Sequence, residues 1–133
     1  MNPFEFIVPR RPVSHQAKDK KHKQEWMDCV YGRARQVWKG TPVSSETLRF
    51  TLVYLCEEYP PDINNIIKPV QDALIGLVYS DDKLVIDVQG HLRMANDLIE
   101  ITGLPPLLQE VIINGVDCLY IRICSSSTLG DLL

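Results

Sequence analysis

The chain has 133 residues, of which 45% are hydrophobic and 23% charged, the balance of a globular domain. A single core typically serves about 100–200 residues, so we expect one domain over residues 1–124 and a flexible tail over residues 125–133. No apolar run approaches the roughly 18 residues of a membrane-spanning helix. Glu5 and Pro9 interrupt the apolar start of the chain, unlike a signal peptide. These features argue against a membrane protein and favour a cytoplasmic one.

Positive charge is concentrated in the first third of the sequence. Residues 1–39 contain nine Lys or Arg and four acids, a net charge of +5, whereas the whole chain has a net charge of −3. The remaining residues therefore carry −8. A basic segment on an acidic body is typical of proteins that bind a polyanion, although a solvated helix face rich in lysine gives the same counts.

The four cysteines are scattered: Cys29, Cys56, Cys118 and Cys124. They form no C-x-x-C pair and have no histidine at zinc-finger spacing. We interpret them as reduced, mostly buried thiols, with a zinc site or a disulfide framework as the alternatives.

Strands and helices are expected to alternate along the chain. Residues 4–8 predict a strand because apolar and polar side chains alternate there, and Pro9 ends it. Residues 19–39 are typical of a helix. Its apolar side chains recur at intervals close to one helical turn and are expected on one face: Trp26, Val30, Val37 and Trp38.

The rest of the chain continues this alternation. Residues 48–56 are rich in β-branched and aromatic side chains and predict the clearest strand. A helix is expected over residues 65–75, with Pro69 limiting its extent upstream and Gly76 ending it. The remaining elements are two strands and a short helix, expected at residues 84–88, 118–124 and 105–113. The pattern allows a parallel α/β sheet or a mixed α+β sheet.

Acids, amides and one lysine gather between residues 62 and 82. Three of them are successive i, i+4 neighbours and share one face of the expected helix: Asn64, Lys68 and Asp72. Asp62 lies at the turn before that helix and the Asp81-Asp82 pair at the turn after it. Phosphodiester hydrolysis uses such groups, because carboxylates bind Mg²⁺, bound metal activates water and lysine offsets transition-state charge.

The same residues also have a purely structural interpretation. Asp62 or Asn64 can cap the helix, and the two aspartates beyond it can be turn residues. Lys68 and Asp72 can form a surface pair worth roughly 0.2–0.5 kcal/mol. Spacing alone therefore does not establish a catalytic site.

This stretch resembles the signature of the RusA family of crossover-junction endodeoxyribonucleases. The signature is D-x-D-N, then a lysine, the triplet D-A-L and a D-D pair. The corresponding positions here are Asp62, Asn64, Asn65, Lys68, Asp72, Ala73, Leu74, Asp81 and Asp82. The resemblance extends over most of residues 4–123, including an opening strand, a loop with Pro12 and Ser14, and a basic helix that ends in Trp38.

The resemblance implies a small α+β domain, with a mixed β-sheet flanked by helices, that forms a homodimer. It also implies an endonuclease of DNA recombination and repair that resolves Holliday junctions with Mg²⁺, with Mn²⁺ as the alternative metal. Two sites suit a symmetric four-way junction, where two strands are cut. The residues implied as catalytic are Asp62, Lys68 and Asp82. The implied metal ligands are Asp62, Asn64, Asp81 and Asp82, with Asn65 and Asp72 in supporting roles.

Asn64 departs from the family pattern, which has an acid at this position. An amide oxygen can bind Mg²⁺ but lacks the charge of a carboxylate. One alternative is therefore a catalytically impaired protein that still binds branched DNA. Another is a globular domain whose basic helix binds protein.

The basic segment contains the expected DNA contacts. We predict that six side chains contact phosphates around the branch point: Arg10, Arg11, Lys18, Lys20, Lys21 and Lys23. Such contacts position DNA without reading its sequence.

Overall fold

The structure is a computed structural model that describes residues 1–14, 18–58, 62–115 and 117–133. Its elements are β1 (Phe4–Val8), α1 (Lys20–Val37), β2 (Leu48–Cys56), α2 (Ile63–Leu74), the 3₁₀ turn η1 (Asp82–Leu84), β3 (Val85–Met94), α3 (Pro106–Asn114), β4 (Cys118–Ser125) and α4 (Leu129–Leu132). The strands form one sheet in the order β1-β4-β2-β3. β4 is antiparallel to both neighbours, whereas β2 and β3 are parallel. The sheet is therefore mixed, and the α+β prediction is confirmed.

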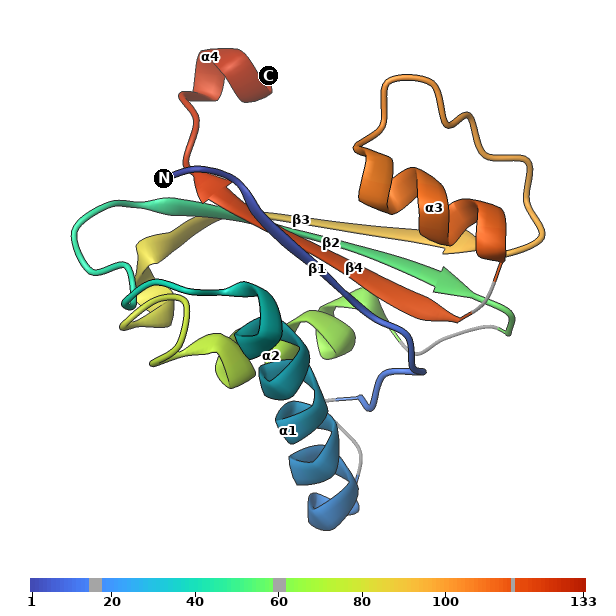
Figure 1. Ribbon diagram of the computed structural model, residues 1–133, viewed down its shortest axis with the longest axis horizontal. Helices are drawn as coiled ribbons and strands as arrows, with labels where there is room; N and C mark the ends of the chain where they lie inside the picture. The colour runs from blue at the N-terminus through green and yellow to red at the C-terminus, as the bar shows by residue number, and fades with distance from the viewer. Residues whose placement is uncertain (15–17, 59–61, 116) are drawn as a thin grey trace.

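Two layers of helices flank the sheet unequally. α1 and α2 lie on one face, and α3 covers only one end of the other face (Figure 1). The parallel pair β2–β3 is joined through α2, as a crossover between parallel strands requires. The predicted site residues lie at the start of α2 and in the turn before β3. Both segments therefore belong to the same β2–α2–β3 unit.

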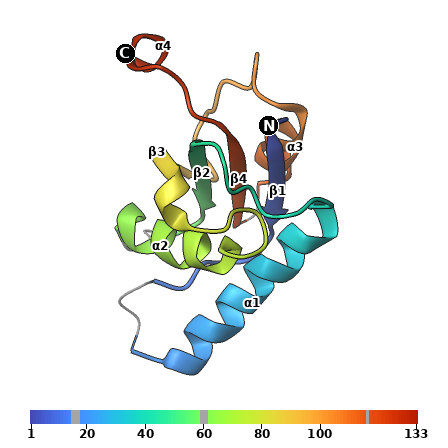
Figure 2. The same cartoon turned by 90° about the vertical axis from the view of Figure 1, so that its left-hand side faces the viewer.

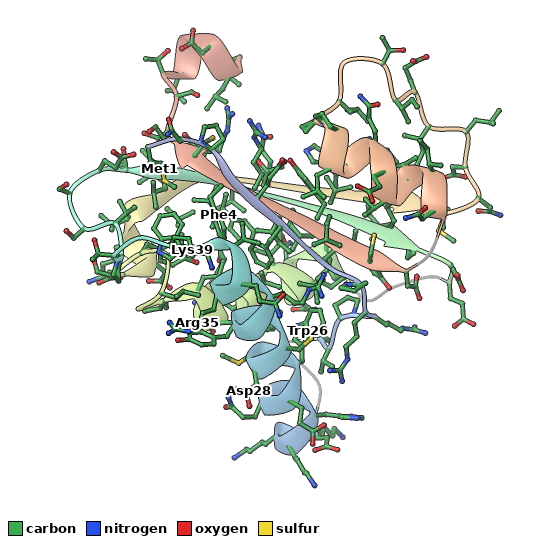
Figure 3. The ribbon with its side chains drawn as sticks, in the orientation of Figure 1. Met1, Phe4, Trp26, Asp28, Arg35 and Lys39 are labelled. Atoms are coloured by element: carbon green, nitrogen blue, oxygen red, sulfur yellow. The ribbon has the colours of Figure 1, made fainter. Side chains whose placement is uncertain are left out.

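The main core fills the space between the sheet and the two helices. Alternate residues of β2 point into it, among them Phe50 and Leu52, and Trp26 of α1 is fully buried against them (Figure 3). The prediction for Val37 is wrong, since it is 50% exposed at the last position of α1. The next residue, Trp38, packs edge-on against Phe4 with ring centroids 5.1 Å apart and takes the core position instead.

α2 is longer at its start than the sequence predicted. It begins at Ile63 and contains Pro69, which was expected to limit it. Pro69 cannot donate to the carbonyl one turn earlier, but it is buried, and the apolar stripe that α2 packs on the core outweighs this loss. β3 is also longer than predicted and ends at Met94, because it pairs with β2 along its whole length.

The second face of the sheet is open beyond α3. Under α3 lies a smaller apolar cluster that includes Leu55, Cys118 and Tyr120. α3 and α4 both lie on this side of the sheet, opposite α1 and α2 (Figure 2). The segment predicted as a flexible tail contains α4, and Ser126 N–H donates to the carbonyl of Thr47 at 3.0 Å.

Two further expectations concern the cysteines and the membrane. All four cysteines are free thiols, with Cys56 and Cys118 buried and the other two half-buried. Among the described helices, none combines the length and apolar character that a membrane crossing needs.

Candidate active site

The N-terminus of α2 presents three of the predicted site residues. Asp62 caps the helix, because its Oδ1 accepts a hydrogen bond of 3.0 Å from the N–H of Asn64. The N–H of Asn65 donates to the Asp62 carbonyl at 2.9 Å. The side chains of Asp62 and Asn64 are exposed, and that of Asn65 is half-buried. Capping uses Oδ1 of Asp62, so its structural role leaves the other oxygen of this exposed carboxylate available to a ligand.

Lys68 lies between two carboxylates that come from different elements. Its Nζ is 2.9 Å from Oδ1 of Asp72, one turn along α2, and 3.1 Å from Oδ2 of Asp82 in η1. Hydrogen bonds to Asp72 and then to Asp82 raise the pKa of Lys68 above its usual value. The ammonium therefore stays charged at neutral pH, and its stabilising contribution is lost only as pH rises through this raised pKa.

The two aspartates after Tyr79 have different roles. Asp81 caps η1, since its Oδ1 accepts a hydrogen bond of 2.9 Å from the N–H of Lys83. Asp82 turns its carboxylate to Lys68, and the hydrogen bond from the Lys68 ammonium lowers the pKa of Asp82. Asp82 thus stays ionised at neutral pH, and its contribution to stability is lost only as pH falls through this lowered pKa.

Tyr79 holds the turn with the two aspartates against α2, a role that the sequence did not reveal. Its hydroxyl donates to the carbonyl of Gln71 at 2.7 Å, and its side chain is fully buried. Gln71 lies in the last turn of α2, where helix carbonyls lack an intrahelical partner. Burial, followed by the nearby charges of Asp82 and Asp72, raises the pKa of Tyr79, so the hydroxyl remains a neutral donor.

Replacing Tyr79 with phenylalanine is expected to lower the free energy of unfolding by about 1–1.5 kcal/mol, because the Gln71 carbonyl loses its partner. The change should appear in urea denaturation as a lower midpoint with an unchanged slope. Tyr31, which is 40% exposed on α1, provides the control, and Tyr31→Phe should leave the midpoint unaltered. Equal urea midpoints for the two variants would show that the Tyr79 hydroxyl does not stabilise the turn that contains Asp81 and Asp82.

Backbone contacts complete the support of the cluster. Gly76 follows α2 with φ of 85°, a left-handed conformation that favours glycine, and its N–H donates to the Tyr79 carbonyl at 2.7 Å. The N–H of Ser80 donates to the Val43 carbonyl at 2.9 Å. On the other side, α2 lies so close to β3 that a Cβ at Gly90 would be 2.8 Å from Ile67. The site therefore lies on α2 and on the turn after it, which hydrogen bonds hold in place.

The donor atoms at this site fit a hard divalent cation by type. Carboxylate and amide oxygens, such as those of Asp62, Asn64 and Asp82, are the ligands that Mg²⁺ prefers. Within the described residues, however, no three His, Cys, Asp or Glu side chains converge into a ready metal cluster. The cation between carboxylates is instead Lys68. A metal ion that binds Asp82 would have to compete with this ammonium.

Five of the six predicted DNA contacts are exposed, and all six precede this cluster in the sequence. Arg10 and Arg11 follow β1, and Arg11 forms an ion pair of 3.3 Å with Glu58. Lys18, Lys20 and Lys21 are exposed at the start of α1, and Lys23 is half-buried. The first turn of α1 has no acid. Asp19 caps the helix, and its carboxylate accepts hydrogen bonds from the N–H of Lys21 and of His22, so an acid already lies at the helix N-terminus among these lysines.

A mixed four-stranded sheet with a lysine–aspartate cluster at its crossover helix defines a small α+β domain with one charged site. The family model for endodeoxyribonuclease RusA matches residues 7–102, more than half of the chain. The chain therefore belongs to the RusA family, as the signature predicted. A search of the curated proteins found no match. The matched region contains every predicted site residue, whereas α3 and the central strand β4 lie beyond it.

Proposed function

We propose that this chain is a structure-selective endonuclease that cuts four-way DNA junctions by paired phosphodiester hydrolysis. The observation that carries the proposal is the ammonium of Lys68, held between Asp72 and Asp82 in a member of the RusA family. A nicking assay on a synthetic four-way junction, with linear duplex of the same sequence as control, tests it. Cleavage of the two substrates at equal rates would contradict structure selectivity.

Lys68 and Asp82 would have complementary roles in the reaction. Lys68 stays charged and can approach a backbone phosphate, where a positive charge stabilises the charge that develops in the transition state. Asp82 stays ionised and directs the ammonium. Asp62, Asn64, Asp81 and Asp82 would hold Mg²⁺ or Mn²⁺, which when bound supplies Lewis acidity and lowers the pKa of water.

Junction binding would rest on the basic segment around the start of α1. The triple variant Lys20→Ala, Lys21→Ala and Lys23→Ala should weaken binding and lower the slope of log K against log salt by about 2.7, since each lost phosphate contact accounts for about 0.9. Gel-shift titrations over a range of salt concentrations measure both quantities. Lys39→Ala, at the other end of α1, is the control and should change neither. An unchanged slope in the triple variant would remove this segment from the interface.

A second candidate function is junction binding without cleavage. Asn64 favours it, because the family signature has an acid where this chain has a neutral amide. Gel shifts with and without Mg²⁺, run beside the nicking assay, separate the two functions. Binding without any nicking, in Mg²⁺ and in Mn²⁺, would support the binding protein.

Paired hydrolysis also requires two active sites on one junction. We therefore propose a homodimer with two-fold symmetry, which matches the symmetry of the junction. Light scattering at micromolar concentration tests this assembly. A species of 15.2 kDa that still resolves junctions would contradict it.

A further inference from the structure

The open face of the sheet contains a groove whose two ends differ in chemistry. It forms a cavity of about 770 Å³. At the α3 end its lining includes the apolar side chains of Leu55, Leu104 and Leu108, beside the charged side chains of Arg93, Asp97 and Glu100. At the opposite end, β2 contributes Arg49, six residues before Leu55. The apolar end also exposes Leu98, whose side chain has no cover within the described part of the chain (104% exposed).

α4 is a short element that carries two leucines and packs little against the rest of the described chain. It comprises four residues, none of them buried, and Leu129 is 71% exposed. A helix this short has no stability of its own in water and depends on tertiary contacts. α4 projects from the sheet on the same side as the groove, at the end opposite α3 (Figures 1 and 2).

The segment before α4 prevents it from reaching the apolar end of its own groove. Oγ of Ser127 accepts a hydrogen bond of 3.2 Å from Arg49, and its N–H donates to Asp87 at 3.4 Å. Only Thr128 separates Ser127 from α4. The six steps along β2 from Arg49 to Leu55 span about 20 Å at about 3.3 Å per step. α4 is therefore held at the wrong end of the groove in its own chain.

A two-fold axis through the open face would exchange the two ends. It would bring α4 of one subunit over the apolar end of the groove in its partner, and the reverse contact would form at the same time. Charged side chains also line both ends of the groove. Nε of Arg49 is buried without a hydrogen-bond partner within the described residues, while Asp97 and Glu100 line the groove on the loop beside α3.

We propose that the open face of the sheet is the homodimer interface and that each subunit inserts α4 into the groove of the other. The inference rests on the homodimer proposed above and specifies its surface. Leu129 supplies an apolar anchor, and Leu98 closes over it from the rim. Asp97 and Glu100 of one subunit approach the Arg49 end of the other.

Two single substitutions test the two sides of this contact. Leu129→Asp alters α4 and Leu98→Asp alters the groove, and both side chains are exposed in the monomer, so neither change should affect folding. Each variant is expected to raise the dimer dissociation constant by about 30-fold or more, the effect of losing a central apolar anchor. Sedimentation velocity over a concentration series measures the constant, and circular dichroism checks the fold. Val37→Asp, at a 50% exposed position of α1, introduces the same charge as a control and should remain dimeric.

The outcomes distinguish this inference from the proposed function. If the unmodified chain and Val37→Asp are dimers while Leu129→Asp and Leu98→Asp dissociate, the result supports the mutual insertion of α4. If either Leu129→Asp or Leu98→Asp dimerises as tightly as the unmodified chain, the interface lies elsewhere and only this inference fails. Dissociation of Val37→Asp to the same extent would also overturn it. An unmodified chain that is monomeric throughout would overturn the homodimer itself, whether or not junctions are cut.

Discussion

Replacing Asp82 with asparagine is expected to reduce junction cleavage by about 10²–10³-fold, the loss that follows removal of one preorganised charge interaction. The neutral amide keeps the size of the side chain but no longer attracts the ammonium of Lys68, which is 3.1 Å away. Lys68 keeps Asp72 as a partner, so it remains charged at neutral pH. The slower cleavage should therefore come from a less well positioned Lys68 ammonium and from the missing charge of Asp82, not from deprotonation of Lys68.

Junction binding should distinguish this effect from unfolding. Because the proposed DNA surface lies on the basic segment, Asp82→Asn should bind a four-way junction as the unmodified chain does, in a gel shift without divalent metal. Asp28→Asn, an exposed acid on α1 (Figure 3), is the matched control and should retain cleavage. Single-turnover nicking rates measure the defect. Cleavage by Asp82→Asn within tenfold of the unmodified rate would remove this carboxylate from the catalytic group.

The order of elements could be predicted because local patterns determine it. The aromatic and β-branched run of β2 and the repeat of Trp26 and Val30 on α1 each specify their own element. The order of strands in the sheet could not be predicted in this way. β4 lies in the interior of the sheet, between β1 and β2, although it comes last among the strands in sequence. That arrangement follows from contacts between distant segments, which no window of the sequence contains.

The site shows the same division between local and distant contacts. The pair of Lys68 and Asp72 follows from helical spacing, and the family signature marked Asp82. The support from Tyr79 was missed because one tyrosine in an apolar run carries no sign of which carbonyl it reaches. Its bond to Gln71 depends on the fold of the turn after α2. Residues that bear charge were thus easier to predict than the neutral residue that positions them.

The structural and catalytic interpretations of the motif also prove compatible. Asp62 does cap α2, and Lys68 does pair with Asp72, as the structural interpretation predicted. Capping fixes the position of the Asp62 carboxylate at the helix N-terminus, and the ion pairs fix the ammonium. A catalytic site needs its charged groups held in this manner before substrate arrives. Structural roles for these residues therefore do not count against catalytic ones.

Replacing Asn64 with aspartate is expected to raise nicking and to tighten Mg²⁺ binding, because a hard cation gains a charged oxygen where the chain now offers an amide. The substitution should not harm the fold. Asn64 is exposed, and it lies in the first turn of α2, which contains no acid. A negative charge there stabilises the helix by roughly 0.3–1 kcal/mol, so the melting temperature should stay the same or rise slightly. Gln36→Glu, at an exposed position near the end of α1, adds the same charge away from the motif and should not improve cleavage.

Mn²⁺ provides a second measurement on the same pair of proteins. Mn²⁺ binds nitrogen and oxygen ligands more tightly than Mg²⁺ does in general, so it should partly rescue the unmodified chain and help Asn64→Asp less. Metal titrations followed by calorimetry, beside nicking rates in each metal, give both quantities. If Asn64→Asp melts normally and yet neither binds Mg²⁺ more tightly nor nicks faster, residue 64 is not a metal ligand. Asp62, Asp81 and Asp82 would then have to hold the ion, and the departure from the signature would carry no cost to cleavage.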